Sequence, residues 1–152
     1  MKIFLSRLFP VILILGLSSG CNTSDSMDDR GLTGNSQGYA LEEKNDSGIS
    51  GSIRFEEFHG GDTFVTMQLG GVDFDETYEL RLHDNTVEEG GPMMLELGEI
   101  FGLTGTNDAI IDAEDNRLSY DDLIEYNGHV LVHISGNNDT PVAAGDIGSN
   151  AD

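Results

Sequence analysis

The chain has 152 residues and one cysteine, and it carries 28 Asp and Glu against seven Lys and Arg, a net charge of -21 at pH 7. This charge excludes binding to nucleic acid or to an anionic lipid surface, because both would repel the chain. A single cysteine cannot form an internal disulfide, so a folded domain has to be stabilised by its core alone.

The first 20 residues have the three parts of a secretory signal peptide. Lys2 and Arg7 supply positive charge, residues 8–17 (LFPVILILGL) form an apolar run, and the small residues 18–20 (SSG) precede Cys21. The apolar run is shorter than the roughly 20 residues that cross a bilayer. Residues 17–21 (LSSGC) resemble a bacterial lipobox, although a serine stands where that motif usually has leucine. We therefore expect residues 1–20 to be a lipoprotein signal peptide and Cys21 to become the acylated N-terminus.

The residues after Cys21 predict where the anchored protein resides and where its domain begins. Asn22 stands where an aspartate would resemble an inner-membrane retention signal, which favours the outer membrane, facing either the periplasm or the cell surface. Residues 22–47 contain few large apolar side chains and no periodicity, which predicts a flexible acidic tether. The expected domain spans residues 48–152, and the lipid anchor makes the membrane its one indicated partner.

From residue 48 onward, short alternating runs are broken by Gly, Asn and Asp. The predicted strands are residues 49–55, 63–69, 77–83, 95–103 and 127–134, whereas residues 120–126 predict at most one short helical turn. Short strands at this spacing, joined by Gly-rich turns, are typical of an antiparallel sandwich or barrel. We therefore expect an all-β domain.

The alternation also predicts which side chains leave the core. Leu80, Leu82 and Val132 are expected to face inward. Successive side chains of a strand point to opposite faces, so His83 and His133 should point outward.

Six segments resemble, in order, the copper/zinc superoxide dismutase family. They are residues 51–55 (GSIRF), 60–61 (GG), 78–86 (YELRLHDNT), 95–98 (LELG), 128–133 (GHVLVH) and 143–148 (AAGDIG), and they cover about 100 residues. The resemblance implies a Greek-key β-barrel with a copper site on its outside and a zinc site beside it. It places His83 and His133 at copper-ligand positions and Glu96 at the position of the zinc aspartate.

This sequence departs from that family at several functional positions. Arg81, a permanent cation, replaces the first histidine of the His-x-His pair. Residues 84–95 contain no histidine for zinc. Pro141 replaces the arginine that guides superoxide, and Ala144 replaces a disulfide cysteine. We therefore expect zinc and dismutase activity to be lost, and copper to be held weakly by His83 and His133, with Glu96 as a further candidate ligand.

The other two histidines are interpreted as surface residues. His129 and His133 lie four residues apart on one predicted strand, about 13 Å at roughly 3.3 Å per residue, so they cannot share one ion. His59 falls in a predicted turn.

The function that we expect is that of a binding or structural module in the cell envelope, and two alternative functions remain open. One is an active superoxide dismutase with a copper-only site. The other is an acidic β-sandwich lipoprotein that binds calcium or a partner protein, in which residues 112–116 (DAEDN) and 136–139 (GNND) would supply oxygen ligands. Such clusters are also ordinary turn formers.

Overall fold

The computed structural model describes residues 31–116, 118–137 and 140–151. The expected signal peptide, Cys21 and the first part of the expected tether lie outside this range. The described elements are β1 (Leu32–Glu43), β2 (Ser50–Phe58), β3 (Thr63–Gly70), β4 (Thr77–Asp84), β5 (Met93–Phe101), β6 (Thr106–Ile111), α1 (Ala113–Asn116), α2 (Tyr120–Glu125), β7 (Asn127–Ile134) and β8 (Ala143–Gly148). Within the described part of the chain, no helix has the length and apolar character needed to cross a membrane.

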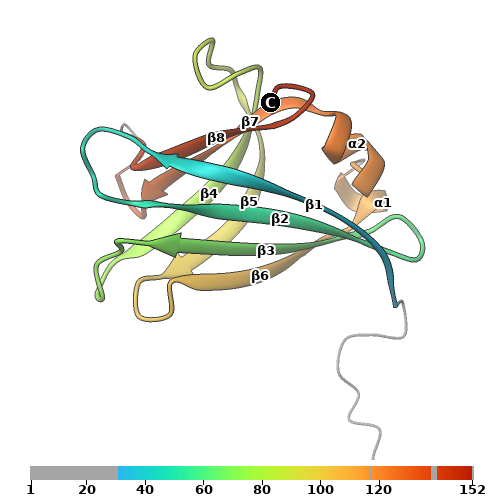
Figure 1. The fold of residues 1–152 in the computed structure, drawn as a ribbon, viewed down its shortest axis with the longest axis horizontal. Coiled ribbons are helices and arrows are strands. Elements are labelled where there is room, and N and C mark those ends of the chain that lie inside the picture. Colours follow the sequence, from blue (N-terminus) through green and yellow to red (C-terminus); the bar gives the residue numbers. More distant parts are fainter. Residues whose placement is uncertain (1–30, 117, 138–139, 152) are drawn as a thin grey trace, which may run out of the picture.

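The strands form one antiparallel sheet in the order β5-β4-β7-β8-β1-β2-β3-β6. Figure 1 shows β1, β2, β3 and β6 as one layer, with β4 and β5 crossing behind it. The outermost strands also approach each other, because the Asn107 side-chain amide on β6 donates a hydrogen bond of 2.6 Å to the Glu99 carbonyl on β5. The sheet is therefore a nearly closed Greek-key barrel, which confirms the predicted all-β fold.

The core lies inside this barrel and is formed by the alternating residues of the strands. Leu80, Leu82 and Val132 are fully buried, as the alternation predicts. They pack with the other large buried side chains of the core, which include Leu41, Ile53, Phe55, Val65, Met67, Tyr78, Ile100, Leu123, Val130 and Ile147. Because these side chains fill the interior, the residues between them are left for the outer face.

The prediction of a flexible tether is wrong for residues 32–43, because these residues form strand β1. Only Tyr39 and Leu41 of this strand are buried, so its sequence carries almost no apolar periodicity. Its order comes from pairing with β2, from Leu32 opposite Phe58 to Leu41 opposite Gly51. The described domain therefore begins about 16 residues earlier than the hydrophobic pattern predicts.

Helix α2 and strand β5 can be compared with the helical turn and the fourth strand predicted from the sequence. The predicted helical turn at residues 120–126 is confirmed as α2, which starts with reciprocal hydrogen bonds between Ser119 and Asp122 and buries Tyr120 and Leu123. The fourth predicted strand is shifted. It ends at Phe101, and Leu103 lies in an exposed turn, where it is 67% solvent-accessible.

Candidate functional site

The outer face of β4, β7 and β8 brings two histidines together. The register places His83 opposite His129, and His129 opposite Asp146 on the next strand. The two imidazole rings stack, with their centroids 5.3 Å apart and their planes at 25°. His83 and His129 therefore form a pair that is set by strand register.

The loop between β4 and β5, residues 85–92, is held against this pair. The His129 Nδ1 atom lies 2.8 Å from the Asn85 carbonyl, and the His83 Nδ1 atom lies 3.0 Å from the Gly91 carbonyl. A carbonyl oxygen can only accept a hydrogen bond, so each Nδ1 carries the proton. In the neutral form of each ring, Nε2 then holds the lone pair that can bind a metal ion.

A third bond fixes the middle of the same loop. The Asp146 carboxylate on β8 accepts a hydrogen bond of 2.7 Å from the Val87 backbone N–H. The loop thus rests on side chains from β4, β7 and β8. This gives both imidazoles a supporting shell that sets their orientation.

The pair borders a pocket of about 710 Å³, whose lining includes Lys44, His83, Glu88, His129, Leu131 and Asp146. His129 is only 1% solvent-accessible. The Nε2 atom of His83 is buried and has no hydrogen-bond partner within the described residues. A buried polar atom without a partner costs free energy, which a bound ion at this position would recover.

His133 occupies a different part of the same face. It lies opposite Glu79, whose carboxylate pairs with the Arg81 guanidinium and accepts a hydrogen bond of 2.9 Å from the Ser135 hydroxyl. His133 is 4% solvent-accessible, and its Nδ1 atom has no hydrogen-bond partner among the described residues. Burial lowers the pKa of His133, and the charges of Arg81 and then His83 lower it further, which favours the neutral ring.

The structure does not bring together His83, His133 and Glu96, the three metal ligands that the sequence predicts. Because His83 lies opposite His129, it is separated from His133 by four positions along β7, about 13 Å of strand. Glu96 is exposed on β5, opposite Arg81. Within residues 31–116, 118–137 and 140–151, no three His, Cys, Asp or Glu side chains are grouped so that they could hold a metal ion.

The sequence interpretation missed His129 as a member of the site. The alternation places it on the outer face with His133, yet it is buried there and contacts the loop through the Asn85 carbonyl. The pairing register of β4 and β7 would have identified it, and no local pattern reveals that register.

Among the residues that the structure describes, the remaining sequence candidates form no second metal-binding group. The Asp112 carboxylate accepts a hydrogen bond of 3.1 Å from the Asp115 backbone N–H, an ordinary turn contact. Part of the predicted turn at residues 136–139 lies outside the described residues. Pro141 and Ala144 both line the pocket beside the histidine pair.

Comparison with known protein families finds no family that matches the chain, and comparison with curated proteins finds no relative. The resemblance to superoxide dismutases therefore stays a prediction from the sequence motifs.

Proposed function

We propose that this chain is an envelope-anchored binding module that captures copper weakly through His83 and His129. The observation that carries the proposal is the stacked pair itself, in which both Nδ1 atoms are engaged by backbone carbonyls. Both rings are thereby committed to the tautomer that offers Nε2 to a ligand.

Copper fits this pair better than other common divalent ions. Imidazole nitrogen suits copper, and copper heads the affinity series of first-row divalent metals. Two protein ligands leave the other coordination positions to water or to a small ligand. We therefore expect weaker binding than in a site with three or four protein ligands.

The surroundings of the pair favour capture over superoxide chemistry. The net charge of -21 repels an anionic substrate unless local positive charge focuses it. Arg81, the nearest cation along β4, is paired with Glu79. Lys44 lines the pocket beside the pair, together with the carboxylates of Glu88 and Asp146. Bound copper would supply one-electron chemistry, but this lining has two carboxylates for one lysine and does not focus an anion.

The envelope location is supported by the sequence of the first 21 residues. A signal peptide followed by Cys21 would deliver the barrel across the inner membrane and attach acyl chains to that cysteine. Two acyl chains give stable anchoring, because each buried methylene contributes about 0.8 kcal/mol.

The test is copper uptake by the full chain purified in detergent. We expect one Cu(II) per chain, with nitrogen hyperfine structure in its electron paramagnetic resonance spectrum, and loss of that signal in His83→Ala. Uptake that is unchanged in His83→Ala would contradict the proposal. Dismutation by the copper-loaded chain would instead support the copper-only enzyme. A rise in melting temperature with calcium and none with copper would support the acidic binding protein.

A further inference from the structure

The barrel has a seam between β1 and β8. These strands pair at only two positions, Glu42 with Ala144 and Glu43 with Ala143. Residues 32–41, which precede these pairs on β1, pair with β2 but not with β8. Residues 145–148, which follow these pairs on β8, pair with β7 but not with β1. Both strands therefore present an edge to the seam.

The direction of the backbone groups on β1 follows from one hydrogen bond. The Lys44 N–H donates to the Val142 carbonyl at 2.9 Å, which directs the backbone of Lys44 toward β8. Backbone direction alternates along a strand, so every second residue before it, including Gly38 and Ala40, also directs its N–H and C=O into the seam.

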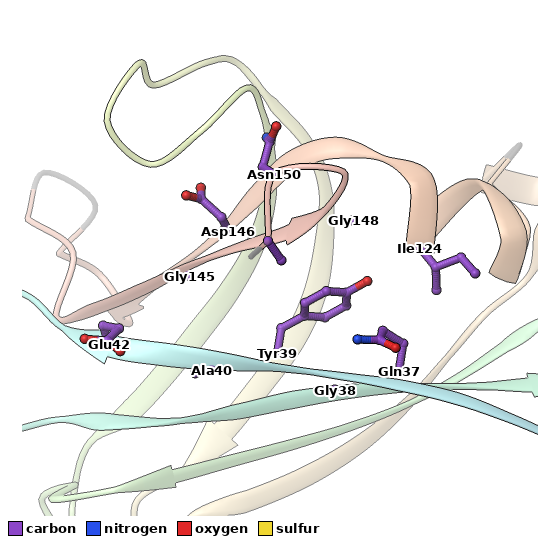
Figure 2. A pocket seen from close by; sticks show the side chains of 11 residues that line it. Gln37, Gly38, Tyr39, Ala40, Glu42, Ile124, Gly145, Asp146, Gly148 and Asn150 are labelled. Carbon is purple, nitrogen blue, oxygen red and sulfur yellow. The ribbon is translucent and has the colours of Figure 1, made fainter.

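The seam is closed at one point and open beyond it. A Cβ atom on Gly145 would lie 2.0 Å from the Ala40 carbonyl oxygen, so the two backbones touch there. Beyond this contact lies a cleft of about 520 Å³, which reaches from Gly38 on β1 past Gly148 on β8 to Ile124 on α2. Figure 2 shows the Tyr39 ring projecting from β1 toward Gly148 and Ile124.

Small residues keep the backbone of the cleft accessible. Its lining includes Gly38, Ala40, Gly145, Gly148 and Ala151. On the β8 side, the Tyr39 hydroxyl is hydrogen-bonded to the Gly148 backbone. The edge of β1 is therefore the side at which an extended ligand can make backbone hydrogen bonds.

The polar side chains that line the cleft define the charge of its occupant. They are the carboxylates of Glu42 and Asp146 and the amides of Gln37 and Asn150, and this lining contains no basic side chain. A second copy of the chain would bring a further net charge of -21, which disfavours pairing between copies. A positively charged partner fits the cleft.

We propose that the cleft between β1 and β8 binds an extended, lysine- or arginine-rich segment of a partner protein. The segment adds as a strand along β1, with its backbone hydrogen-bonded at Gly38, beyond the closed contact of Ala40 with Gly145, and its basic side chains beside Glu42 and Asp146. Exposed strand edges bind peptides in this way, with backbone bonds giving affinity and side-chain contacts giving selectivity.

Two synthetic peptides of equal charge test this proposal by calorimetric titration of the full chain in detergent. The first alternates lysine with valine over six residues, and the second alternates lysine with proline, which removes every second backbone N–H donor. We expect the lysine-valine peptide to bind and the lysine-proline peptide to bind at least about tenfold more weakly, given about 1 kcal/mol for each lost hydrogen bond. Equal binding of both peptides would overturn the proposal, since the attraction would then depend on charge alone.

Variants at Gly38 locate the site. Gly38→Pro removes the N–H that faces the seam, whereas Gly38→Ala keeps it and adds a methyl group whose nearest neighbour is the Ile53 carbonyl at 3.9 Å. We expect about tenfold weaker binding in Gly38→Pro only. Equal affinity in the two variants would contradict strand addition at β1.

If Gly38→Pro does not fold, as judged by circular dichroism, the double variant Glu42→Gln, Asp146→Asn replaces it. This change keeps an oxygen that can accept the hydrogen bond from Val87. It should weaken the lysine-valine peptide about tenfold, and unchanged affinity would place the peptide elsewhere.

Discussion

His83 on β4 and His129 on β7 face each other across a strand pair, with their ring centroids 5.3 Å apart. Each ring is held by a carbonyl at one end of the same loop, Gly91 for His83 and Asn85 for His129. The loop and the histidine pair therefore orient each other. Each ring thereby keeps an unprotonated Nε2 atom in its neutral form, and that of His83 is buried without a partner among the described residues.

The first prediction concerns the anchor. Cys21→Ser removes the thiol that would receive the lipid, so incorporation of labelled palmitate should be abolished in cells that express the chain. The protein should also move from the membrane fraction to the soluble fraction. Palmitate labelling of Cys21→Ser equal to that of the parent chain would show that the lipid is attached elsewhere.

The second prediction concerns the stability of the barrel in mild acid. The pKa of His133 is lowered below 6.5 in the folded chain by burial and by Arg81. The unfolded chain therefore takes up a proton near pH 6.5 that the folded chain resists, and the free energy of unfolding falls as the pH drops below that value. His133→Gln should show a smaller loss than the parent chain between about pH 7.5 and 5.5, measured by urea denaturation. Identical pH dependence in both chains would contradict the assignment.

The third prediction concerns the alkaline range. Burial and a hydrogen bond to the Asp84 carboxylate raise the pKa of Tyr126 to about 12. The folded chain keeps this proton where the unfolded chain, with a tyrosine pKa of 10.0, loses it. Stability should therefore fall as the pH rises from about 10 to 12. An ultraviolet titration of Tyr126→Phe should lack the last tyrosinate step of the parent chain, and an unchanged last step would assign it to another tyrosine.

The fourth prediction uses two glycines on either side of the seam. Gly145→Ala would force a methyl group to within 2.0 Å of the Ala40 carbonyl oxygen, whereas the methyl group of Gly38→Ala meets only the Ile53 carbonyl at 3.9 Å. The first change should lower the free energy of unfolding by about 1–3 kcal/mol. The second should change it by no more than about 0.5 kcal/mol. Equal stability of the two variants in urea denaturation would contradict the close contact of β1 and β8.

The sequence predicts the parts of the fold where burial alternates strictly. β3 and β4 each bury every second residue, so Val65 and Leu80 stand out from their less buried neighbours. β7 alternates in residue type at Val130 and Val132, although its outward His129 and His133 are buried as well. β1 and β6 lack this signal. Among the residues of β6 only Ile111 is buried, and its pairing with β3 follows from the closure of the barrel.

The candidate site is less predictable because it depends on register. The alternation correctly places His83 and His133 on the outer face, but it cannot show which residues of β4 and β7 lie opposite each other. Solvent exposure on that face depends on the loop of residues 85–92, which covers His129. Neither the partner of His83 nor the burial of His129 is encoded in the spacing of one strand.

The most direct test of the histidine pair compares copper binding in His129→Ala and His133→Ala, two substitutions of the same kind on the same strand. Copper is titrated into the full chain in detergent, and the nitrogen hyperfine structure of Cu(II) is followed by electron paramagnetic resonance. The stacked pair predicts that His129→Ala loses the signal and that His133→Ala keeps it. A signal that survives in His129→Ala and is lost in His133→Ala would contradict the assignment of the site to His83 and His129.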